Sequence, residues 1–233
     1  MAKHKRIQLG LALFGAGALA LLATAGVEAQ QDTPQYKPPS RGAPASRVGG
    51  ATRGPGDQRP QIAVLAPDHT GLTSREQPDL FWYVSKPVQT RLEITVINDQ
   101  AEQPVLEASV SLPKGPGLQR IRLSDHGVKL KPGVEYRWFV GLVVDQKQRS
   151  NDIVASGTIQ YTVQPQAVQE RLAKVPQGQR YRILAEEGVW YDAIALLADE
   201  MDAQPGNGAL RRDLGSLLQQ VGIAEMVRRG INP

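Results

Sequence analysis

The stretch that most constrains the fold runs from Leu130 to Trp138, with the sequence Leu-Lys-Pro-Gly-Val-Glu-Tyr-Arg-Trp. Pro132 presets φ and Gly133 accepts a positive φ, so this pair predicts a tight turn. After the turn, apolar residues recur at every second position, which is typical of a strand with one buried face. We expect that face to belong to a core, and it carries Tyr136, Trp138, Val140, Leu142 and Val144.

The order Leu-x-Pro-Gly-x-x-Tyr-x-Trp in this stretch resembles the fibronectin type III domain and related immunoglobulin-like β-sandwiches. The resemblance implies that the Tyr136 hydroxyl returns to the backbone of the preceding turn, as a tyrosine corner. The alternative is a generic hairpin in another β fold.

Six further segments carry strand signals, and turn residues separate them at sandwich spacing. The segments are 62–65, 78–84, 91–96, 104–112, 118–123 and 153–163. Segment 78–84 is apolar on both faces, which predicts a central strand. We therefore expect residues 61–163 to form a β-sandwich domain, so that the protein is mainly β.

After Val163 the apolar period lengthens to about 3.5 residues, which predicts a helical tail over residues 164–233. Short helices are expected over 167–174 and 180–187, the second of them ended by Gly188 in the left-handed conformation. Two further helical faces follow, on either side of a break at 205–207. The first face carries Trp190, Ile194, Leu197 and Met201, and the second Leu210, Leu214, Leu217 and Val221.

Gly188 and Gly222 are 34 positions apart, which is the period of tetratricopeptide repeats. Trp190, Ala193, Leu197, Pro205 and Leu214-Gly215 follow the order of that repeat, whereas Glu200 replaces a small residue. The tail thus resembles one and a half repeats, and about three are needed to bury a core alone. We expect a helical hairpin that docks its Trp190 face on the sandwich; the alternative is an independent peptide-binding array.

The first 29 residues have the pattern of a secretory signal peptide. Lys3, Lys5 and Arg6 precede an apolar run over 9–23, and Val27-Glu28-Ala29 provides a small-x-Ala cleavage site. We expect cleavage after Ala29, a periplasmic or extracellular location and no stable membrane span afterwards. An uncleaved N-terminal anchor is the alternative. The chain contains no cysteine, which excludes a lipoprotein anchor, disulfides and thiolate chemistry.

Residues 30–60 are rich in Pro, Gly, Gln, Ser and Arg, which predicts a disordered linker. This segment holds five basic and two acidic side chains, whereas residues 61–163 hold eleven of each. Any attraction to a cell-wall polymer or another anionic polymer would therefore depend on linker arginines, namely Arg41, Arg47, Arg53 and Arg59. A solvated linker without a ligand is the competing interpretation, and we expect no nucleic-acid partner.

Asp68-His69-Thr70, followed by Ser74, contains the residue types of a serine hydrolase. No Gly-x-Ser-x-Gly motif accompanies them, and Pro-Asp-His-Thr-Gly is also typical of a turn in which Gly71 has a positive φ. We favour the turn, and we expect no catalytic residue, no cofactor and no metal site.

Phe139 and Tyr83 lie on the strand faces opposite Trp138 and Trp82. They are candidates for exposed binding aromatics or for a place under the helical tail, and we favour the second. Structural roles are predicted for Tyr136, Trp138, Trp82, Gly133, Trp190 and Gly188.

Several ordered motifs together look like a bacterial family, the domain-of-unknown-function 928 proteins. They occur at 65–73, 80–84, 133–138, 149–152 and 188–193. This chain lacks two features frequent in that family, a Cys near Val144 and a Trp after Gly157. The resemblance implies the architecture above and an envelope or secreted location, and it brings no established activity.

We therefore expect a non-catalytic interaction module that binds an unknown envelope protein or cell-wall polymer. The alternatives are a minor hydrolase or carbohydrate-active enzyme that uses the loop 68–75, and an anionic-polymer binder that uses the basic linker.

Overall fold

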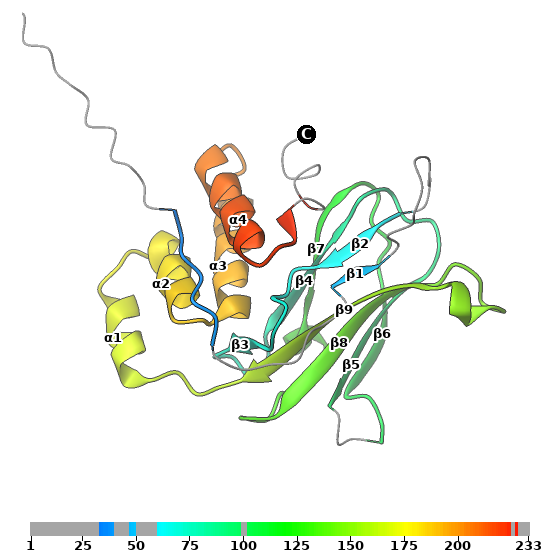
Figure 1. Cartoon of the computed structure of the whole chain (residues 1–233), viewed down its shortest axis with the longest axis horizontal. Coiled ribbons are helices and arrows are strands. Elements are labelled where there is room, and N and C mark those ends of the chain that lie inside the picture. The colour runs from blue at the N-terminus through cyan, green and yellow to red at the C-terminus, as the bar shows by residue number, and fades with distance from the viewer. Residues whose placement is uncertain (1–32, 40–46, 50–59, 99–101, 225–226, 228–233) are drawn as a thin grey trace, which may run out of the picture. The chain divides into compact units, whose positions relative to one another are not determined.

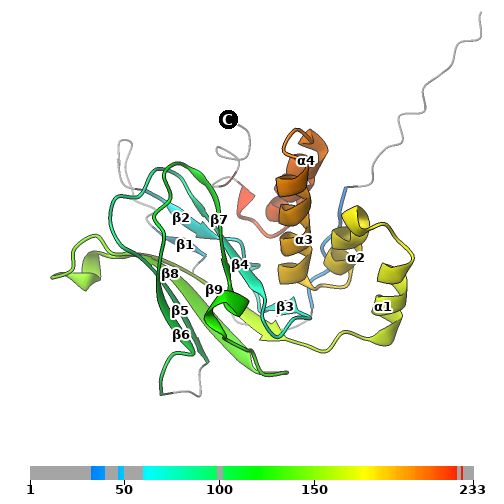
Figure 2. The ribbon, with the colours of Figure 1, turned by 180° about the vertical axis from the view of Figure 1, so that it is seen from behind.

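A computed structural model describes residues 33–39, 47–49, 60–98, 102–224 and 227. The expected signal peptide and most of the expected linker lie outside these residues. The described part is mostly β with some helix, as Figures 1 and 2 show from opposite sides. None of its helices is long and apolar enough to cross a membrane.

The strands form two sheets. The first has the order β1-β2-β4-β7 and is antiparallel, with bounds Val48–Gly49, Ile62–Val64, Asp79–Val84 and Gly117–Arg122. The second has the order β3-β9-β8-β5-β6, with bounds Gly71–Thr73, Ile153–Tyr161, Glu135–Leu142, Leu92–Asn98 and Leu106–Val110. In the second sheet β3 runs parallel to β9, whereas the other neighbouring strands are antiparallel.

Both sheets contribute side chains to one hydrophobic core. Every residue of β4 is buried, which confirms the predicted central strand. In β8 the alternation is also as predicted, and Tyr136 and Trp138 are buried in the core. Val144 is the exception, because β8 ends at Leu142 and the side chain of Val144 is 42% exposed.

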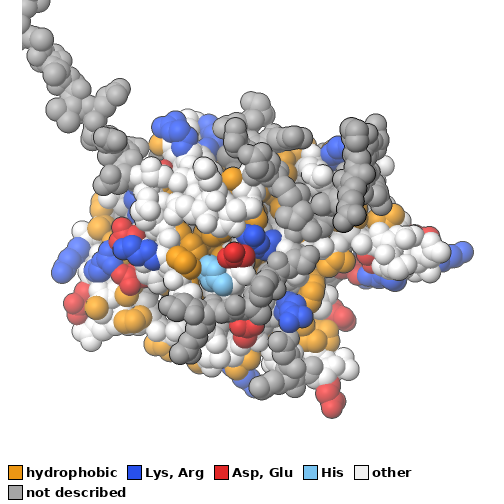
Figure 3. Space-filling model, in the orientation of Figure 1, with side chains coloured by type: hydrophobic (Ala, Val, Ile, Leu, Met, Phe, Trp, Pro, Cys, Tyr) orange, Lys and Arg blue, Asp and Glu red, His pale blue; other side chains and the backbone are white. Residues whose placement is uncertain are grey.

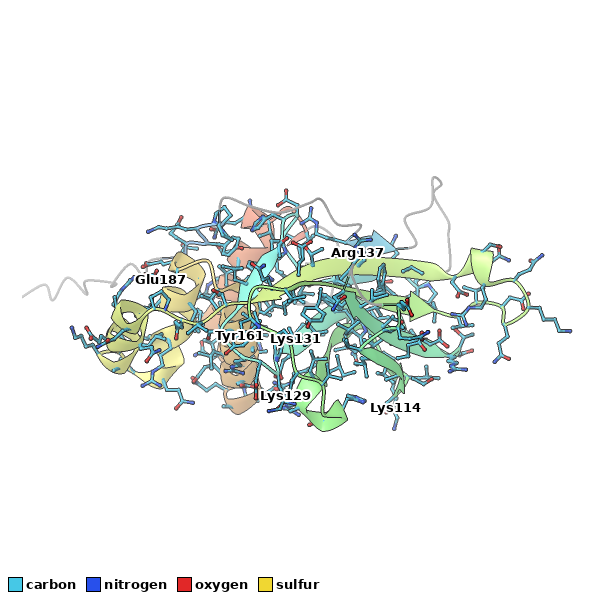
Figure 4. All side chains as sticks on the ribbon, turned by 90° about the horizontal axis from the view of Figure 1, so that it is seen from below. Lys114, Lys129, Lys131, Arg137, Tyr161 and Glu187 are labelled. Carbon is cyan, nitrogen blue, oxygen red and sulfur yellow. The ribbon has the colours of Figure 1, made fainter. Side chains whose placement is uncertain are left out.

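The turn before β8 forms as predicted. Gly133 has a φ of 74°, and its backbone N–H donates to the carbonyl oxygen of Tyr161 at 2.9 Å. The Lys131 backbone N–H donates to the Tyr136 hydroxyl at 3.1 Å, which is the expected bond from the tyrosine to the preceding turn. Figure 4 shows Lys131 close to Tyr161, where Pro132 bridges to the end of β9.

The tail contains helices α1 (Gln166–Ala173), α2 (Arg180–Glu186), α3 (Trp190–Ala203) and α4 (Gly208–Gln220), close to the predicted bounds. Gly188 has a φ of 75° and follows α2, as expected for a left-handed helix end. Asn207 caps α4, since its side-chain oxygen accepts from the Ala209 backbone N–H at 3.0 Å.

Buried polar contacts hold α3 against the sheets, which confirms the expected docking of the Trp190 face. The Trp190 indole N–H donates to the Leu65 carbonyl oxygen at 2.8 Å. The neighbouring Tyr191 hydroxyl accepts from the Trp138 indole N–H at 2.8 Å and donates to the Thr158 carbonyl oxygen at 2.9 Å. At the surface, Arg120 of β7 pairs with Asp199 at 2.5 Å and with Asp202 at 3.2 Å, both from α3.

Part of the expected disordered linker is ordered against this body. Residues Thr33–Pro39, which we call the strap, run extended beside the helices, and Tyr36 is only 8% exposed. Residues 48–49 form β1, paired with β2. The expectation fails here because one aromatic ring and a few backbone hydrogen bonds offset the ordering cost of a short segment, whatever the average composition of residues 30–60.

Gly157 lies at a close approach between β9 and the core. An added Cβ would stand 2.7 Å from Ala66 Cβ and 2.8 Å from the Trp138 indole nitrogen, and both neighbours are buried. We expect Gly157→Ala to lower the free energy of unfolding by about 1–3 kcal/mol, as measured by chemical denaturation. Gly141→Ala in β8 is the matched control, because its Cβ would meet no atom closer than 4.0 Å. Equal effects of the two substitutions would contradict this explanation.

Candidate functional site

The strap, the turn before β3 and the start of α3 bring polar and aromatic side chains together. We call this group the Tyr36 cluster; it comprises Tyr36, Arg47, Asp68, His69 and Trp190. The Tyr36 ring meets the Trp190 ring edge to face, with centroids 4.8 Å apart, and stacks on the His69 ring at 5.8 Å. In Figure 3 a histidine lies among hydrophobic, acidic and basic side chains on this face, which is the composition of the cluster.

Both ring nitrogens of His69 have partners within the cluster. Nδ1 lies 3.0 Å from Asp68 Oδ1, and Nε2 lies 2.8 Å from the Tyr36 hydroxyl. The hydrogen bond from His69 lowers the pKa of Asp68, and the nearby charge of Arg47 lowers it further. Burial raises the pKa of Tyr36, and the charge of Asp68 acts in the same direction.

This carboxylate–imidazole–phenol chain is poorly suited to nucleophilic catalysis. A nucleophile is activated when its pKa is lowered or when a base takes its proton, whereas burial here keeps the Tyr36 phenol protonated. One hydrogen bond of this chain, between the Tyr36 hydroxyl and His69 Nε2, joins the strap to the 68–69 turn, and the other lies within the turn. The arrangement fixes the position of the Tyr36 ring relative to the turn.

The hydrolase residues predicted from the sequence are divided between two places. His69 belongs to the Tyr36 cluster, whereas the Ser74 hydroxyl donates to Asp192 of α3. Asp192 Oδ2 also accepts the Ser74 backbone N–H at 3.0 Å, and its Oδ1 accepts the Thr73 hydroxyl at 2.6 Å. Ser74 is thus bonded to a carboxylate that anchors α3 to the end of β3, and its hydroxyl is not paired with His69.

The expected turn over 67–71 is also different in detail. Residues 71–73 form β3, and Gly71 has no positive φ. The position needs glycine for another reason: an added Cβ would lie 2.6 Å from Cε2 of Tyr191. The sequence Pro-Asp-His-Thr-Gly has the composition of a turn, so a short parallel strand after it could not be distinguished from the sequence alone.

The main chain of the strap is held by two residues of the tail. The Gln220 side-chain amide bonds it twice, accepting the Tyr36 backbone N–H at 2.8 Å and donating to the Pro34 carbonyl oxygen at 2.8 Å. The Lys37 backbone N–H donates to the Ala185 carbonyl oxygen at 3.1 Å. Sequence analysis missed Tyr36 and Gln220, although Tyr36 is the only aromatic residue in 30–60.

The other predicted binding residues are not gathered at this site. Tyr83 is 3% exposed and belongs to the core, so it is no surface aromatic. Phe139 is half-buried in β8. Arg47 donates to the Val221 carbonyl oxygen at the end of α4, so its guanidinium has a structural partner. Arg41, Arg53 and Arg59 lie outside the described residues.

Some exposed cations of the described part are paired with acidic side chains. Lys129 pairs with Glu76 at 2.7 Å, and Arg149 bonds both Glu93 and Asp152 at 2.6 Å. Figure 4 shows Lys114, Lys129 and Lys131 on a part of the surface away from Glu187 at the end of α2. Among the described residues, no group of three or more His, Asp or Glu side chains is placed to hold a metal ion.

Burial of four tyrosines predicts a loss of stability in alkaline solution. The pKa values of Tyr36, Tyr83, Tyr181 and Tyr191 are raised, with burial as the largest cause for each. Above pH ~10 the unfolded chain releases these protons while the folded chain keeps them. The free energy of unfolding should therefore be fully retained below that pH and fall above it, by up to about 1.4 kcal/mol per pH unit for each fully buried phenol.

The measurement is chemical denaturation between about pH 8 and pH 12, a range that brackets the pKa of a free phenol. Ultraviolet titration of the phenols accompanies it. Tyr181→Phe should reduce the alkaline slope by about one proton. Arg182 still bonds Asp213 in that variant, so the carboxylate keeps a partner. An unchanged slope in the variant would contradict the prediction.

Two sheets that share one core with a docked helical tail define a β-rich protein with attached helices. The chain belongs to the family described as Domain of Unknown Function (DUF928), whose model matches residues 48–231. The match includes β1 and both sheets but begins after the strap.

No curated protein matches the chain. Among solved structures, the crystal structure of a multi-domain immunophilin from Arabidopsis thaliana aligns with 82% of this chain and 96% of its own, at 9% sequence identity and a TM-score of 0.16. A score of this size carries no information about fold or function.

Proposed function

We propose that the protein is a secreted, non-catalytic interaction module of the cell envelope. In this proposal a fibronectin-like sandwich carries a tetratricopeptide-like helical hairpin, and the partner is another envelope protein. The observation that carries it is the strap, because the helical tail and the 68–69 turn together bind an extended segment through its main chain and one aromatic ring.

The chemistry-bearing side chains around this site support binding over catalysis. The His69 ring nitrogens are bonded to Asp68 and Tyr36, and the Ser74 hydroxyl is bonded to Asp192. A serine nucleophile needs an adjacent base, and here the Ser74 hydroxyl is bonded to Asp192 while His69 is bonded to Tyr36 and Asp68. A repeat-like helical pair with a bound extended segment resembles the way in which helical repeats recognise peptides.

The test is affinity capture from an envelope fraction with the full mature chain as bait, followed by binding measurements with the purified partner. We expect a saturable complex with one envelope protein. The control measures turnover on a broad panel of hydrolase substrates. Turnover that disappears in both Ser74→Ala and His69→Ala, in variants that remain folded, would contradict the proposal and favour an enzyme that uses residues 68–75.

A further inference from the structure

The strap contacts the body of the protein in the manner of a bound peptide. Pro34 and Tyr36 are buried, whereas Thr33, Gln35 and Lys37 are exposed. This alternation is expected of an extended chain that presents every second side chain to a surface. The two buried positions define a short pattern, Pro-x-Tyr.

The surface beneath the strap recognises the main chain independently of side chains. Gln220 uses both ends of its amide, one for the Tyr36 N–H and the other for the Pro34 carbonyl oxygen, each at 2.8 Å. The Ala185 carbonyl oxygen accepts a third backbone bond, from Lys37. Gly188 permits this approach, since an added Cβ would stand 2.8 Å from the Lys37 carbonyl oxygen.

The tyrosine side chain is recognised separately. The Trp190 ring meets it edge to face, the His69 ring lies nearly parallel to it, and His69 Nε2 is 2.8 Å from its hydroxyl. These contacts select an aromatic ring that carries a polar group at its tip. We call the surface formed by Gln220, Ala185, Gly188, Trp190 and His69 the strap-binding surface.

We propose that the strap-binding surface is a recognition site for an extended Pro-x-Tyr segment of a partner protein, and that the strap occupies it within the same chain. The inference rests on the proposed binding function and assigns it a surface and a ligand class. The prolines at positions 34, 38 and 39 favour extended conformations, which lowers the ordering cost of such a segment.

Because the strap occupies the site, any partner segment must compete with the strap for it. A tethered segment acts at an effective concentration of about the millimolar range. A free peptide must therefore compete with the strap in the wild-type chain, and it should bind far more tightly once the Tyr36 anchor is removed. A partner segment would gain access by exchanging with the strap.

The experiment uses the full mature chain with Tyr36→Ala and a synthetic peptide that spans residues 33–39, titrated by calorimetry. We expect saturable binding with one peptide per chain. A peptide with alanine in place of tyrosine should bind at least about thirtyfold more weakly, as for an interface anchor. A peptide with phenylalanine should bind about two- to tenfold more weakly, because it lacks one hydrogen bond. Adding Gln220→Ala to the chain should weaken all three peptides.

A second measurement covers the case in which Tyr36→Ala does not fold. Excess peptide added to the wild-type chain should speed amide hydrogen exchange at Tyr36 and Lys37, whose N–H groups it releases from Gln220 and Ala185. Absence of both effects overturns the proposal. Concentration-dependent self-association of the wild-type chain that is lost in Tyr36→Ala also overturns it, because the occupant is then a second copy.

These outcomes separate the inference from the proposed function. If an envelope partner is captured but the peptide does not bind, the inference fails and the function remains, with another surface as its site. If the peptide binds but no envelope protein is captured, the proposed partner is wrong.

Discussion

Trp190→Ala is expected to lower the free energy of unfolding by about 3–5 kcal/mol, the range for removing a large buried aromatic ring. Trp190 is completely buried at the start of α3, where it contacts the Tyr36 ring and donates to the Leu65 carbonyl oxygen at 2.8 Å. The substitution leaves a cavity and an unpaired carbonyl group at the junction between the tail and the sheets. Because that junction is weakened, we also expect the tail to unfold before the sheets.

Chemical denaturation followed by far-ultraviolet circular dichroism, to which the helices contribute most, and by Trp fluorescence, which in Trp190→Ala comes from Trp82 and Trp138 in the sheets, measures both effects. The two transitions should coincide in the wild type and separate in Trp190→Ala. Trp190→Phe is the control, since it keeps most of the ring and loses the bond to Leu65, and it should cost less. Coincident transitions and a loss below about 1 kcal/mol for Trp190→Ala would show that the tail does not depend on this contact.

Asp192→Ala has the second-largest expected effect, a loss of about 3 kcal/mol or more. The carboxylate is 2% exposed and accepts three hydrogen bonds, from the Thr73 hydroxyl and from the Ser74 backbone and hydroxyl. Removing it leaves three donors without this acceptor; a buried donor left unpaired costs about 1–3 kcal/mol, and the two donors of half-buried Ser74 cost less because water can reach them. The thermal midpoint and the denaturation free energy measure the effect.

Asp192→Asn is the matched control, because it retains the shape of the side chain and one acceptor oxygen. It should lose clearly less stability than Asp192→Ala. Ser74→Ala removes one of the three donors and leaves the other two bonds intact, so its loss should be smaller still. If Ser74→Ala cost as much as Asp192→Ala, a separate role for Ser74 would have to be considered.

The parts of the fold that the sequence predicted are those governed by local rules. The Pro132-Gly133 turn, the alternation of β8 and the helix end at Gly188 depend on φ preferences and on periodicity, and both can be read from neighbouring residues. The docking of Trp190 was predictable because a tail with one apolar face must bury it. The relative placement of Asp192 and Ser74 was not, since 118 positions separate them.

The candidate site was predicted only in part. His69 and Asp68 were noted, but as members of a possible hydrolase set or a turn. The composition of residues 30–60 predicts a disordered linker because an average over 31 residues conceals one tyrosine that can be buried. Its contacts with Gln220 and His69 depend on the tertiary fold, which no local pattern encodes.

The hydrogen bonds between Gln220 and the strap join positions that are 184 and 186 residues apart. During synthesis, residue 36 leaves the ribosome long before residue 220 exists. The backbone groups of Pro34 and Tyr36 that bond Gln220 therefore lack this partner until almost the whole polypeptide has been made. Contacts of such long sequence separation form slowly, because a large loop must close first. A premature stop before α4 would thus remove the Gln220 contacts of the strap, so that it would affect the beginning of the chain as well as its end.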